Sequence, residues 1–578
     1  MKAAAAIFAL ALGLRLLYLG VALDRRWPHA AAYEGDAIVW AAGAQTIASG
    51  AAPDDPLFFR ANAPAHLLRW LGFTEPARGY TAAKVLWCVV SALACAATYL
   101  FAARAFTPRV ALIAAGLQVL SWDSYVLATS LNTEALYVLL LVLVLAGTWW
   151  LRRRPRPAVA VGLGVVHGLA ILVRIEHLLL LALLMGADLL RGRGSAGGSL
   201  IDGGARAGSG GEGEGDRSPR PTRWRQLALQ LAVAGVALVM CVPASVEQTR
   251  AARQYNTVQR RPTPYDRVEV FWTGDARAFL DQVPAFARVR VFAYVSRLAE
   301  QHGLTQVTAA SARQLWHDEF GDLPERLRTP VFVSGQGPLN FALANHPAAH
   351  GGFSKAALEN RFVSIDPKLT LSLPPHLRLY NHGYAEGLGF IRADPSGWLR
   401  AVGRKLWFFA QGASLALGAY NFPLGRFGER RACDLLTPFP GSGAIWIIAC
   451  AALIVAGARI ARRREAGRLC LLVLLYKLLV TVAFFGYARQ AASIGPVLAI
   501  LAAVAIEALA GAFPAGAWRW SRRPGAVLVA LIVLVAVAAD IHAARHPPAY
   551  DIHGPLRPAP DWGESAFSAN AGIELRPQ

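Results

Sequence analysis

Apolar runs long enough to cross a membrane recur along the whole chain, and they constrain its fold more than any other feature. A bilayer hydrocarbon core of roughly 30 Å needs about 20 helical residues. Only 16% of the residues are charged, whereas an ordinary soluble chain has about a quarter. Suitable runs lie at residues 3–23, 81–103, 108–128, 133–151, 226–243, 444–460, 467–485, 494–512 and 525–541. The sequence therefore predicts an all-α polytopic membrane protein.

A further apolar stretch, residues 158–190, is too long for a single crossing. As one helix it would measure roughly 50 Å. The polar residues Arg174, Glu176 and His177 lie at its middle. We interpret it as two spans, 158–173 and 178–190, joined by a turn that holds these residues. This gives about eleven spans, because the apolar residues 399–420 are better explained as part of an amphipathic segment lying at the membrane interface.

The arginines predict which loops face which side of the membrane. They gather at residues 152–156, 191–225, 459–464 and 519–523. Short cytoplasmic loops carry an excess of Lys and Arg, so all four groups are expected in the cytoplasm and the amino terminus with them. The loops 24–80 and 244–443 and the turns near 129, 175 and 489 are then outside. In a bacterial inner membrane this is the periplasmic side. The first run contains Arg15 and no small-residue cleavage site follows it, so we interpret it as an uncleaved span.

The predicted domain organisation alternates membrane modules with polar segments. The N-terminal membrane module, 1–190, has a long outer loop at 24–80, and a Gly-, Ser- and Arg-rich stretch at 191–225 reads as a flexible cytoplasmic linker. After it we expect a span at 226–243, a mostly helical extracytoplasmic domain at 244–395, an interfacial segment at 396–443, spans within 444–541 and an outer tail at 542–578.

Several common binding functions are disfavoured. The formal net charge is +21, but the arginines lie in short clusters between apolar runs and not in a basic and aromatic stripe, so no nucleic-acid partner is predicted. Residues 192–197 match G-x-G-x-x-G after an apolar helix instead of a strand, which disfavours a nucleotide site. His346 and His350 have no cysteine or acidic residue at ligand spacing. We predict no metal site and no cofactor, and leave a divalent metal open.

Acidic residues and a lysine in the outer loops are candidates for chemistry. Asp36, two residues after Glu34, opens a short helix that is expected to end at Gly50. A carboxylate near helix N-terminal amides stays ionised, so Asp36 fits both a cap and a catalytic base. Lys84 opens the second span, where it either snorkels to the interface or contacts a lipid phosphate. Glu134 opens the fourth span, as a helix-start acid or a catalytic group.

A second group of candidates lies in short turns. Ionisable residues at membrane depth are functional candidates by default, which applies to Arg174, Glu176 and His177. A structural ion pair across helices is the alternative reading. Arg489 lies in a short outer turn, where the positive-inside rule does not require an arginine.

Short motifs follow one another along this topology: Arg15 within residues 11–18, Gly35-Asp36 followed by Ala44 and Gly50, Thr133-Glu134, residues 168–174, residues 338–351, residues 394–400 before Lys405, and Arg489 followed by Pro496. Their order resembles that of the GT-C superfamily of membrane glycosyltransferases, in the bacterial branch akin to protein mannosyltransferases and lipid A aminoarabinose transferases. Two positions depart from the family. Trp40 stands where the family has a tyrosine, and Ala37 stands where many relatives have a second acid.

The resemblance implies an activity and roles for these residues. The donor would be a polyprenyl-phosphate-linked hexose or pentose, and the acceptor a hydroxyl of a lipid, polysaccharide or protein. Asp36 would be the general base, with inversion at the anomeric carbon, and Glu134 a second catalytic residue. The resemblance implies that Lys84, Arg174 and Arg489 stabilise the leaving phosphate. Glu34, Glu176 and His177 complete the predicted substrate site.

Two other classes of function compete with glycosyl transfer. A transporter or lipid flippase would favour internal repeats and helices broken at the membrane midplane, and the sequence has no repeat. A non-catalytic membrane scaffold would display residues 244–395 as a binding module and would need no Asp36. Glycosyl transfer is the preferred prediction mainly because of the family resemblance, and the position of the acids in the outer loops disfavours a transporter.

Overall fold

The chain is described here from a computed structural model, which covers residues 1–21, 36–49, 63–72, 76–129, 131–197, 223–258, 270–349, 351–352, 356–358, 369, 371–413, 444–486 and 488–512. Glu34, His350, the predicted span 525–541 and the tail 542–578 lie outside the described residues. Asp36 begins a helix, but its side chain is outside the description.

The N-terminal half is a bundle of apolar helices with two short helices over one end. The long members are α1 (Lys2–Val21), α4 (Pro76–Ala105), α7 (Thr133–Arg153), α8 (Pro157–Val173) and α9 (His177–Gly197). The shorter ones are α2 (Asp36–Ser49), α3 (Ala63–Trp70), α5 (Pro108–Val119) and α6 (Trp122–Thr129). The prediction that residues 158–190 form two helices is confirmed, since α8 ends at Val173 and α9 begins at His177.

The prediction of one continuous helix over residues 108–128 is wrong. Helix α5 stops at Val119 and α6 begins at Trp122. The hydroxyl of Ser121 accepts a hydrogen bond of 3.4 Å from the backbone N–H of Ser124, as an N-cap does at the start of a helix. The Tyr125 hydroxyl donates to the backbone carbonyl of Val119 at 2.5 Å, which ties the two helices together across the break. Local side-chain hydrogen bonds thus interrupt a run that is apolar enough to continue.

The C-terminal half adds α10 (Arg223–Thr257), α16 (Pro395–Gly412), α18 (Ala444–Ala461), α19 (Glu465–Ala483), α20 (Ala488–Ala492) and α21 (Gly495–Ala512). Helix α10 packs closely on α8, where Gly164 and Gly168 lie against Val236 and Met240. A Cβ added at Gly168 would lie 2.6 Å from the Met240 Cβ. Small residues four apart let two membrane helices approach each other in this way.

Ten described helices are apolar enough to belong to the membrane. Five reach the length of a full crossing: Lys2–Gly20, Ala82–Ala105, Thr133–Arg153, Trp224–Thr257 and Glu465–Ala483. Five are shorter: Pro108–Val119, Pro157–Val173, His177–Leu190, Ile447–Ala461 and Gly495–Gly511. Each predicted run up to residue 512 overlaps one of these ten helices. The protein is therefore a helical protein with several membrane spans, and the count of eleven stays a prediction.

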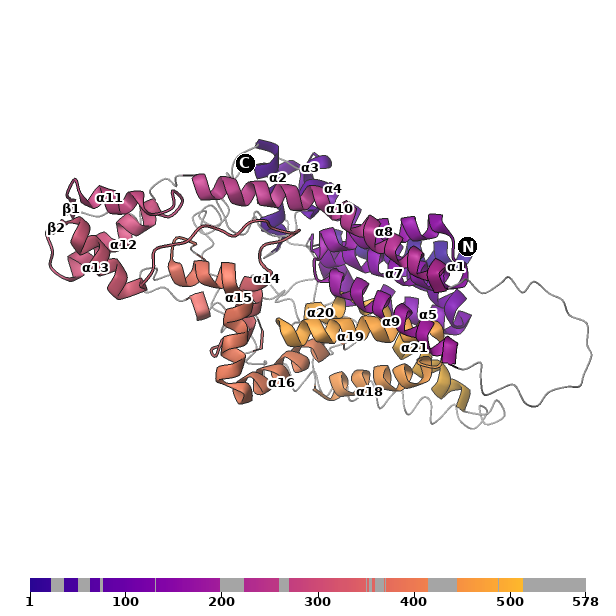
Figure 1. The fold of residues 1–578 in the computed structure, drawn as a ribbon. Helices are drawn as coiled ribbons and strands as arrows, with labels where there is room; N and C mark the ends of the chain where they lie inside the picture. Colours follow the sequence, from indigo (N-terminus) through magenta and orange to yellow (C-terminus); the bar gives the residue numbers. More distant parts are fainter. Residues whose placement is uncertain are drawn as a thin grey trace, which may run out of the picture.

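A separate hydrophobic core holds the polar domain together. Its elements are β1 (Phe271–Trp272), α11 (Ala276–Asp281), α12 (Arg288–Gln301), β2 (Gln306–Val307), α13 (Ala309–Phe320), α14 (Gly337–Asn345), η3 (Ala356–Leu358) and α15 (Pro374–Ala393). The two-residue strands pair in parallel, with Phe271 opposite Gln306. Buried Phe279, Trp316 and Leu377 share the core with Tyr255 of α10. The predicted boundary at residue 244 falls inside α10, which runs unbroken from the bundle into this domain (Figure 1).

The arginine-rich turns meet at one end of the helical bundle. Arg152 at the end of α7 is 2.5 Å from the Asp188 carboxylate of α9. Arg225 of α10 donates to the carbonyl of Pro155 at 3.3 Å, and the guanidinium of Arg464 lies over the Phe106 ring. Residues 134, 174–176 and 489 lie at the opposite ends of their helices. Three of the four predicted arginine groups therefore contribute residues to one shared end, as the predicted topology requires.

This arrangement predicts a result for cysteine labelling in spheroplasts, whose inner membrane is intact. The five described cysteines are buried, so a Cys433→Ser background is suitable. In that background we expect His302→Cys, in the exposed end of α12, to react with a membrane-impermeant maleimide in spheroplasts. Arg463→Cys, in the exposed α18–α19 turn, is expected to react only after permeabilisation. Labelling of both positions from outside would contradict the orientation.

Candidate active site

Five charged side chains from four elements meet at the end of the bundle that faces the polar domain. They are Glu134 in the first turn of α7, Arg174 and Glu176 in the α8–α9 turn, Lys477 of α19 and Arg489 of α20. We call this set the charge cluster. The structure thus brings together four residues that the sequence nominated, and it adds Lys477.

Glu134 holds two arginines with one carboxylate oxygen. Its Oε1 accepts a hydrogen bond of 2.5 Å from Nη1 of Arg174 and lies 2.7 Å from Nε of Arg489. The Glu134 side chain is fully buried. Arg489 also donates through Nη1 to Oδ1 of Asn132, the N-cap residue of α7, at 3.4 Å. The position of Glu134 in the first helical turn suits a negative charge because helix N-termini carry partial positive charge.

Glu176 forms the second carboxylate bridge of the charge cluster. Its Oε1 accepts from Nε of Arg174 at 2.9 Å and from the ammonium of Lys477. Burial alone would raise the pKa of Glu176, but the neighbouring Arg174 and Lys477 cations lower it to about 2. Glu176 is therefore ionised at any physiological pH. Arg174 makes one further contact, from Nη2 to the side-chain oxygen of Gln490 at 3.4 Å.

The charge cluster carries one net positive charge, from three cations and two carboxylates. Charges removed from water need partners, and one further negative charge, such as that of a phosphate diester, would neutralise this set. Accessibility differs among the cations. The Lys477 side chain is fully buried and that of Arg174 is 10% exposed, whereas that of Arg489 is 33% exposed. An anion reaching the charge cluster would therefore meet Arg489 first.

His177 points into the helical bundle. Its Nδ1 lies 2.9 Å from the Tyr137 hydroxyl, and its Nε2 lies 2.9 Å from Nδ1 of His167. The Tyr137 hydroxyl donates in turn to that of Tyr476 at 3.1 Å. All four residues are buried, so both ring nitrogens of His177 are occupied by neighbouring helices. The geometry gives His177 a packing role behind the charge cluster, and its predicted contact with substrate stays a prediction.

Helix α2 is fixed over the start of α7 by a small apolar core. Trp40 and Ala44 of α2 pack with Trp87 of α4, with Ala135 of α7 and with Leu131 in the turn that precedes α7. Ala135 directly follows Glu134 in the chain. The expected helix start at Asp36 is confirmed, and Asp36 lies one turn before Trp40, on the same face of α2.

Lys84 belongs to the same region of the protein. It is buried on α4 between Ala83 and Trp87, which are both members of that small core. The indole N–H of Trp87 donates to the carbonyl of Asn132 at 3.0 Å. Asn132 is the residue that Arg489 contacts, so α4 and the charge cluster are joined through the N-cap of α7. The predicted contact from Lys84 to a phosphate stays a prediction.

Three participants were absent from the sequence-based candidates. Lys477 lies inside the predicted span 467–485, and an ionisable residue within a span is itself a signal that could have nominated it. Asn132 and Gln490 carry no such signal, because surface turns commonly contain Asn and Gln. Their roles come from the tertiary contacts of Arg489 and Arg174.

Asn345 joins the polar domain to the membrane helices. Its amide donates to the carbonyls of Phe341 and Ala483 at 2.8 and 2.9 Å. Its Oδ1 accepts from Nε1 of Trp398 at 3.0 Å and from Nζ of Lys405 at 3.1 Å. Lys405, which is fully buried, also donates to the carbonyl of Val482 at 3.0 Å. This Asn345 junction thus ties α14, α16 and the end of α19 together just before the segment that carries Arg489.

Among the described residues, no three His, Cys, Asp or Glu side chains come together as metal ligands. His346 forms an edge contact with the Phe390 ring, and His350 lies outside the description.

Comparison with known proteins gives matches to solved structures alone. No protein-family model matches the chain, and no curated protein sequence matches it. The oligosaccharyltransferase AglB of Archaeoglobus fulgidus, in complex with an inhibitory peptide and a dolichol-phosphate, is 13% identical with a TM-score of 0.40. Its apo form is 14% identical with a TM-score of 0.42. Both matches cover 96% of this chain and 56% of the archaeal one, so the chain spans just over half the length of these proteins.

ArnT of Cupriavidus metallidurans, bound to undecaprenyl phosphate, is a further match. It is 16% identical with a TM-score of 0.29, and the match covers 86% of this chain and 77% of that one. The function proposed below depends on this chain's own residues.

Loss of the Glu134 carboxylate is expected to be strongly destabilising. Glu134→Ala leaves the buried Arg174 and the partly buried Arg489 without their shared partner, and breaking a buried ion pair costs about 3 to 5 kcal/mol. The free energy of unfolding in mixed detergent micelles, followed by helical circular dichroism, measures this. Glu386→Ala is the control, because it breaks a surface pair with Arg378 and should cost less than about 1 kcal/mol. Equal losses in the two variants would contradict the account.

Lys405 predicts a pH dependence of stability. Burial lowers the pKa of Lys405 from 10.5 to about 8. Below pH 8 the folded protein carries the full cost of a buried ammonium. As the pH rises from about 8 to 10.5 the unfolded chain binds more protons than the folded one, so stability should increase, by up to about 3 kcal/mol. In Lys405→Met the rise in the free energy of unfolding across this range should be smaller by up to about 3 kcal/mol than in the wild type. The exposed substitution Lys2→Met should keep it, and an unchanged rise in Lys405→Met would refute the assignment.

Proposed function

We propose that the protein is an integral membrane glycosyltransferase, which moves a sugar from a polyprenyl-phosphate donor to an acceptor hydroxyl on the extracytoplasmic face of a bacterial inner membrane. The observation that carries this proposal is the charge cluster, with its one excess positive charge and its partly exposed Arg489. A phosphate group of the donor has the charge and the oxygen geometry that arginine recognises.

The proposed reaction forms one bond and breaks one. The acceptor oxygen attacks the anomeric carbon while the bond from that carbon to the phosphate oxygen breaks, with inversion at the carbon. Asp36 takes the acceptor's proton as general base. The electron pair stays on the leaving polyprenyl phosphate, which gains one negative charge. Cations fixed in place before the reaction stabilise such developing charge without reorganising.

In this proposal the cationic residues of the charge cluster and its carboxylates have different roles. Arg174 and Arg489, with Lys84 nearby on α4, bind the donor phosphate. Glu134 acts on the reaction by positioning Arg174 and Arg489, since its carboxylate is buried and bonded to both. Glu176 does the same for Lys477 and Arg174. Glu34 and His177 complete the proposed substrate site.

The position of Asp36 supports its role as the base. Its helix is packed through Trp40 onto the start of α7, the helix that supplies Glu134. Asp36 lies one turn from that contact. A base on α2 would therefore lie near the cations that bind the donor phosphate. The acceptor hydroxyl could then lose its proton to this base while it attacks the anomeric carbon on the side opposite the leaving phosphate.

Removal of the base is the direct test. Asp36→Asn should reduce sugar transfer by about 10²- to 10⁴-fold, the usual contribution of a general base, while membrane insertion and abundance stay unchanged. The measurement is mass spectrometry of envelope glycans and lipids from cells that lack the native protein and express each variant. The product present with the wild type should be missing with Asp36→Asn.

Asp281→Asn is the matched control. Asp281 ends α11 in the polar domain and its side chain is 77% exposed, so the same chemical change there should leave the product at the wild-type level. Wild-type product from Asp36→Asn would refute the role of the base. No difference in envelope composition between cells with and without the protein would refute glycosyl transfer itself.

A further inference from the structure

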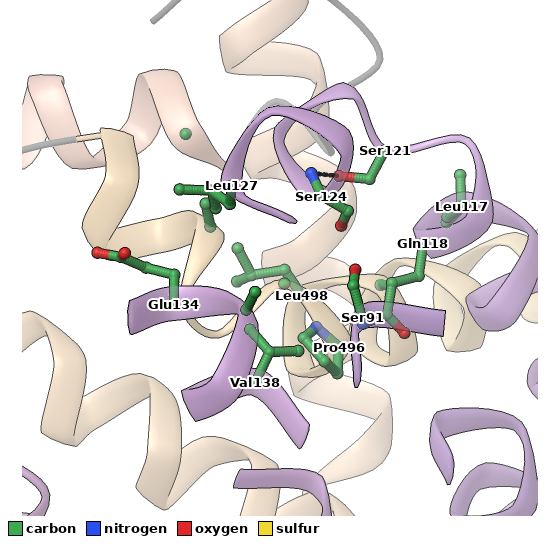
Figure 2. A pocket seen from close by; sticks show the side chains of 15 residues that line it. Ser91, Leu117, Gln118, Ser121, Ser124, Leu127, Glu134, Val138, Pro496 and Leu498 are labelled. Carbon is green, nitrogen blue, oxygen red and sulfur yellow. Dashed lines mark hydrogen bonds between the residues drawn. The ribbon is translucent and has the colours of Figure 1, made fainter. Parts of the chain in front are cut away.

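A small pocket lies between helices of the membrane bundle, beside the charge cluster. In Figure 2, Ser91 and Gln118 lie on one side of it and Glu134 on the other, with Pro496 and Leu498 between them. The space in this pocket that water can reach is about 40 Å³. A volume of this size holds a few water molecules. The pocket is therefore too small for a ligand of lipid size, which would have to bind on the surface of the bundle.

Exposed arginines gather on the surface at the other end of the bundle, in two turns that are far apart in the sequence. Arg104 and Arg109 flank the α4–α5 turn, and Arg462, Arg463 and Arg464 lie in the α18–α19 turn. All five residues are exposed. We call this set the arginine patch. A surface with this concentration of positive charge attracts anions.

Three contacts bring the two turns together. The guanidinium of Arg464 lies over the Phe106 ring, 5.9 Å from its centroid. The Thr107 hydroxyl donates to a carboxylate oxygen of Glu507 on α21 at 2.6 Å. Helix α21 also packs on α18, where Gly457 lies against the α21 backbone. The two turns are thus neighbours in space, and their arginines belong to one surface.

The acidic residues next to the arginine patch have other partners. Glu465 lies 3.9 Å from Nη1 of Arg152 and 4.0 Å from Nε of Arg153, both on α7. Glu507 accepts the hydrogen bond from Thr107. Within the ranges that the structure describes, no carboxylate lies at ion-pair distance from the five arginines of the patch. The arginine patch therefore presents its positive charges to an external anion.

Exposed apolar side chains begin within one helical turn of the arginine patch. Leu112, three residues after Arg109 on α5, is 55% exposed, and Ile460, two residues before Arg462, is 44% exposed. Helices α5 and α18 are both apolar enough to belong to the membrane, so these side chains face acyl chains. The arginine patch consequently lies where the head groups of the adjacent leaflet begin. An anionic phospholipid matches both the charged and the apolar part of this surface, whereas a soluble acidic protein matches the charged part alone.

We propose that the arginine patch binds anionic phospholipids of the leaflet at this end of the bundle. The guanidinium groups of Arg109, Arg462 and Arg463 donate hydrogen bonds to phosphate oxygens, and the acyl chains lie along Leu112 and Ile460. A zwitterionic head group carries its own cation beside the phosphate and gains less from the positive surface. The proposal depends on membrane insertion alone, so its outcome is separate from that of sugar transfer.

Ligands added to the delipidated protein in detergent test the proposal. Dioleoylphosphatidylglycerol is anionic, dioleoylphosphatidylcholine has no net charge, and glycerol 3-phosphate has the phosphate without acyl chains. Bound ligand raises the thermal unfolding midpoint by mass action, so titration of the midpoint gives an apparent Kd. At low salt we expect phosphatidylglycerol to bind about tenfold more tightly than phosphatidylcholine, and the ratio should fall at high salt because exposed charges are screened. Equal midpoint shifts from the two lipids, no shift from either, or an equal shift from glycerol 3-phosphate would overturn the proposal.

A triple variant locates the binding. Arg109→Gln, Arg462→Gln and Arg463→Gln together should weaken phosphatidylglycerol about 10- to 100-fold and leave phosphatidylcholine unchanged, since each arginine near an anionic head group contributes several-fold. These three side chains make no polar contact within the described chain, and Arg464 stays over Phe106. The lipid-free variant should therefore unfold at the wild-type temperature, so that a loss of affinity reports binding and not misfolding.

The matched control removes the same charge from the polar domain. Arg277→Gln, Arg313→Gln and Arg326→Gln change three exposed positions there, and this variant should bind as the wild type does. The single change Arg463→Gln, the mildest in the patch, should weaken phosphatidylglycerol about threefold. Wild-type binding by both patch variants, or equal weakening by the patch triple and the control triple, would place the lipid elsewhere and overturn the proposal.

Discussion

The five charged side chains of the charge cluster are removed from water together, and the rest of the structure depends on their contacts with one another. Arg174 connects the two carboxylates, Glu134 and Glu176, and each carboxylate holds one further cation. Charges at membrane depth are costly when single and tolerable when each has a partner at hydrogen-bond distance. The start of α7, the α8–α9 turn, α19 and α20 are consequently fixed relative to one another by this set of contacts.

The Asn345 junction extends that constraint to the polar domain. The Asn345 side chain uses both of its donors and accepts two hydrogen bonds, and its partners lie on α14, α16 and α19. The segment that follows α19 is held from the same direction, because the amide of Gly486 donates to the carbonyl of Gly351 at 2.8 Å. A side chain at Gly486 would lie 2.4 Å from the Lys405 backbone, so only glycine fits there. The polar domain therefore helps to set the position of Arg489, three residues further on.

The sequence predicts the parts of this molecule that local physics controls. Apolar length gives the helices, and the polar residues at the centre of 158–190 give the turn, because a 33-residue helix cannot match the bilayer. The helix start at Asp36 is predicted from the preference of aspartate for the first positions of a helix. The break at Ser121 was missed because a single serine within an apolar run gives a weak signal, and its cap is visible only in three dimensions.

The sequence predicts the candidate site only in part, because local features of the sequence identify some of its residues but not the residues with which they pair. Arg174, Glu176 and Arg489 stand out because their positions at membrane depth or in an outer turn are unusual for charges. Their pairing, and the choice of Lys477 and Glu134 as partners, depends on which helices lie side by side. His177 has the same signal as Arg174, yet its ring turns toward Tyr137 and His167. Side-chain direction at a turn is a tertiary property that spacing alone does not determine.

The unbroken helix α10 has a mechanical consequence. Its 35 residues measure roughly 50 Å, about 20 Å more than the hydrocarbon core, and Tyr255 near its far end is part of the polar domain's interior. Membrane helices change tilt when the local bilayer thickness changes. A change of about 10° would carry the outer 20 Å of this rod sideways by roughly 3 to 4 Å. Bilayer thickness is thereby coupled to the position of the polar domain over the membrane through one helix, and Pro243 inside α10 is the point at which this coupling can bend.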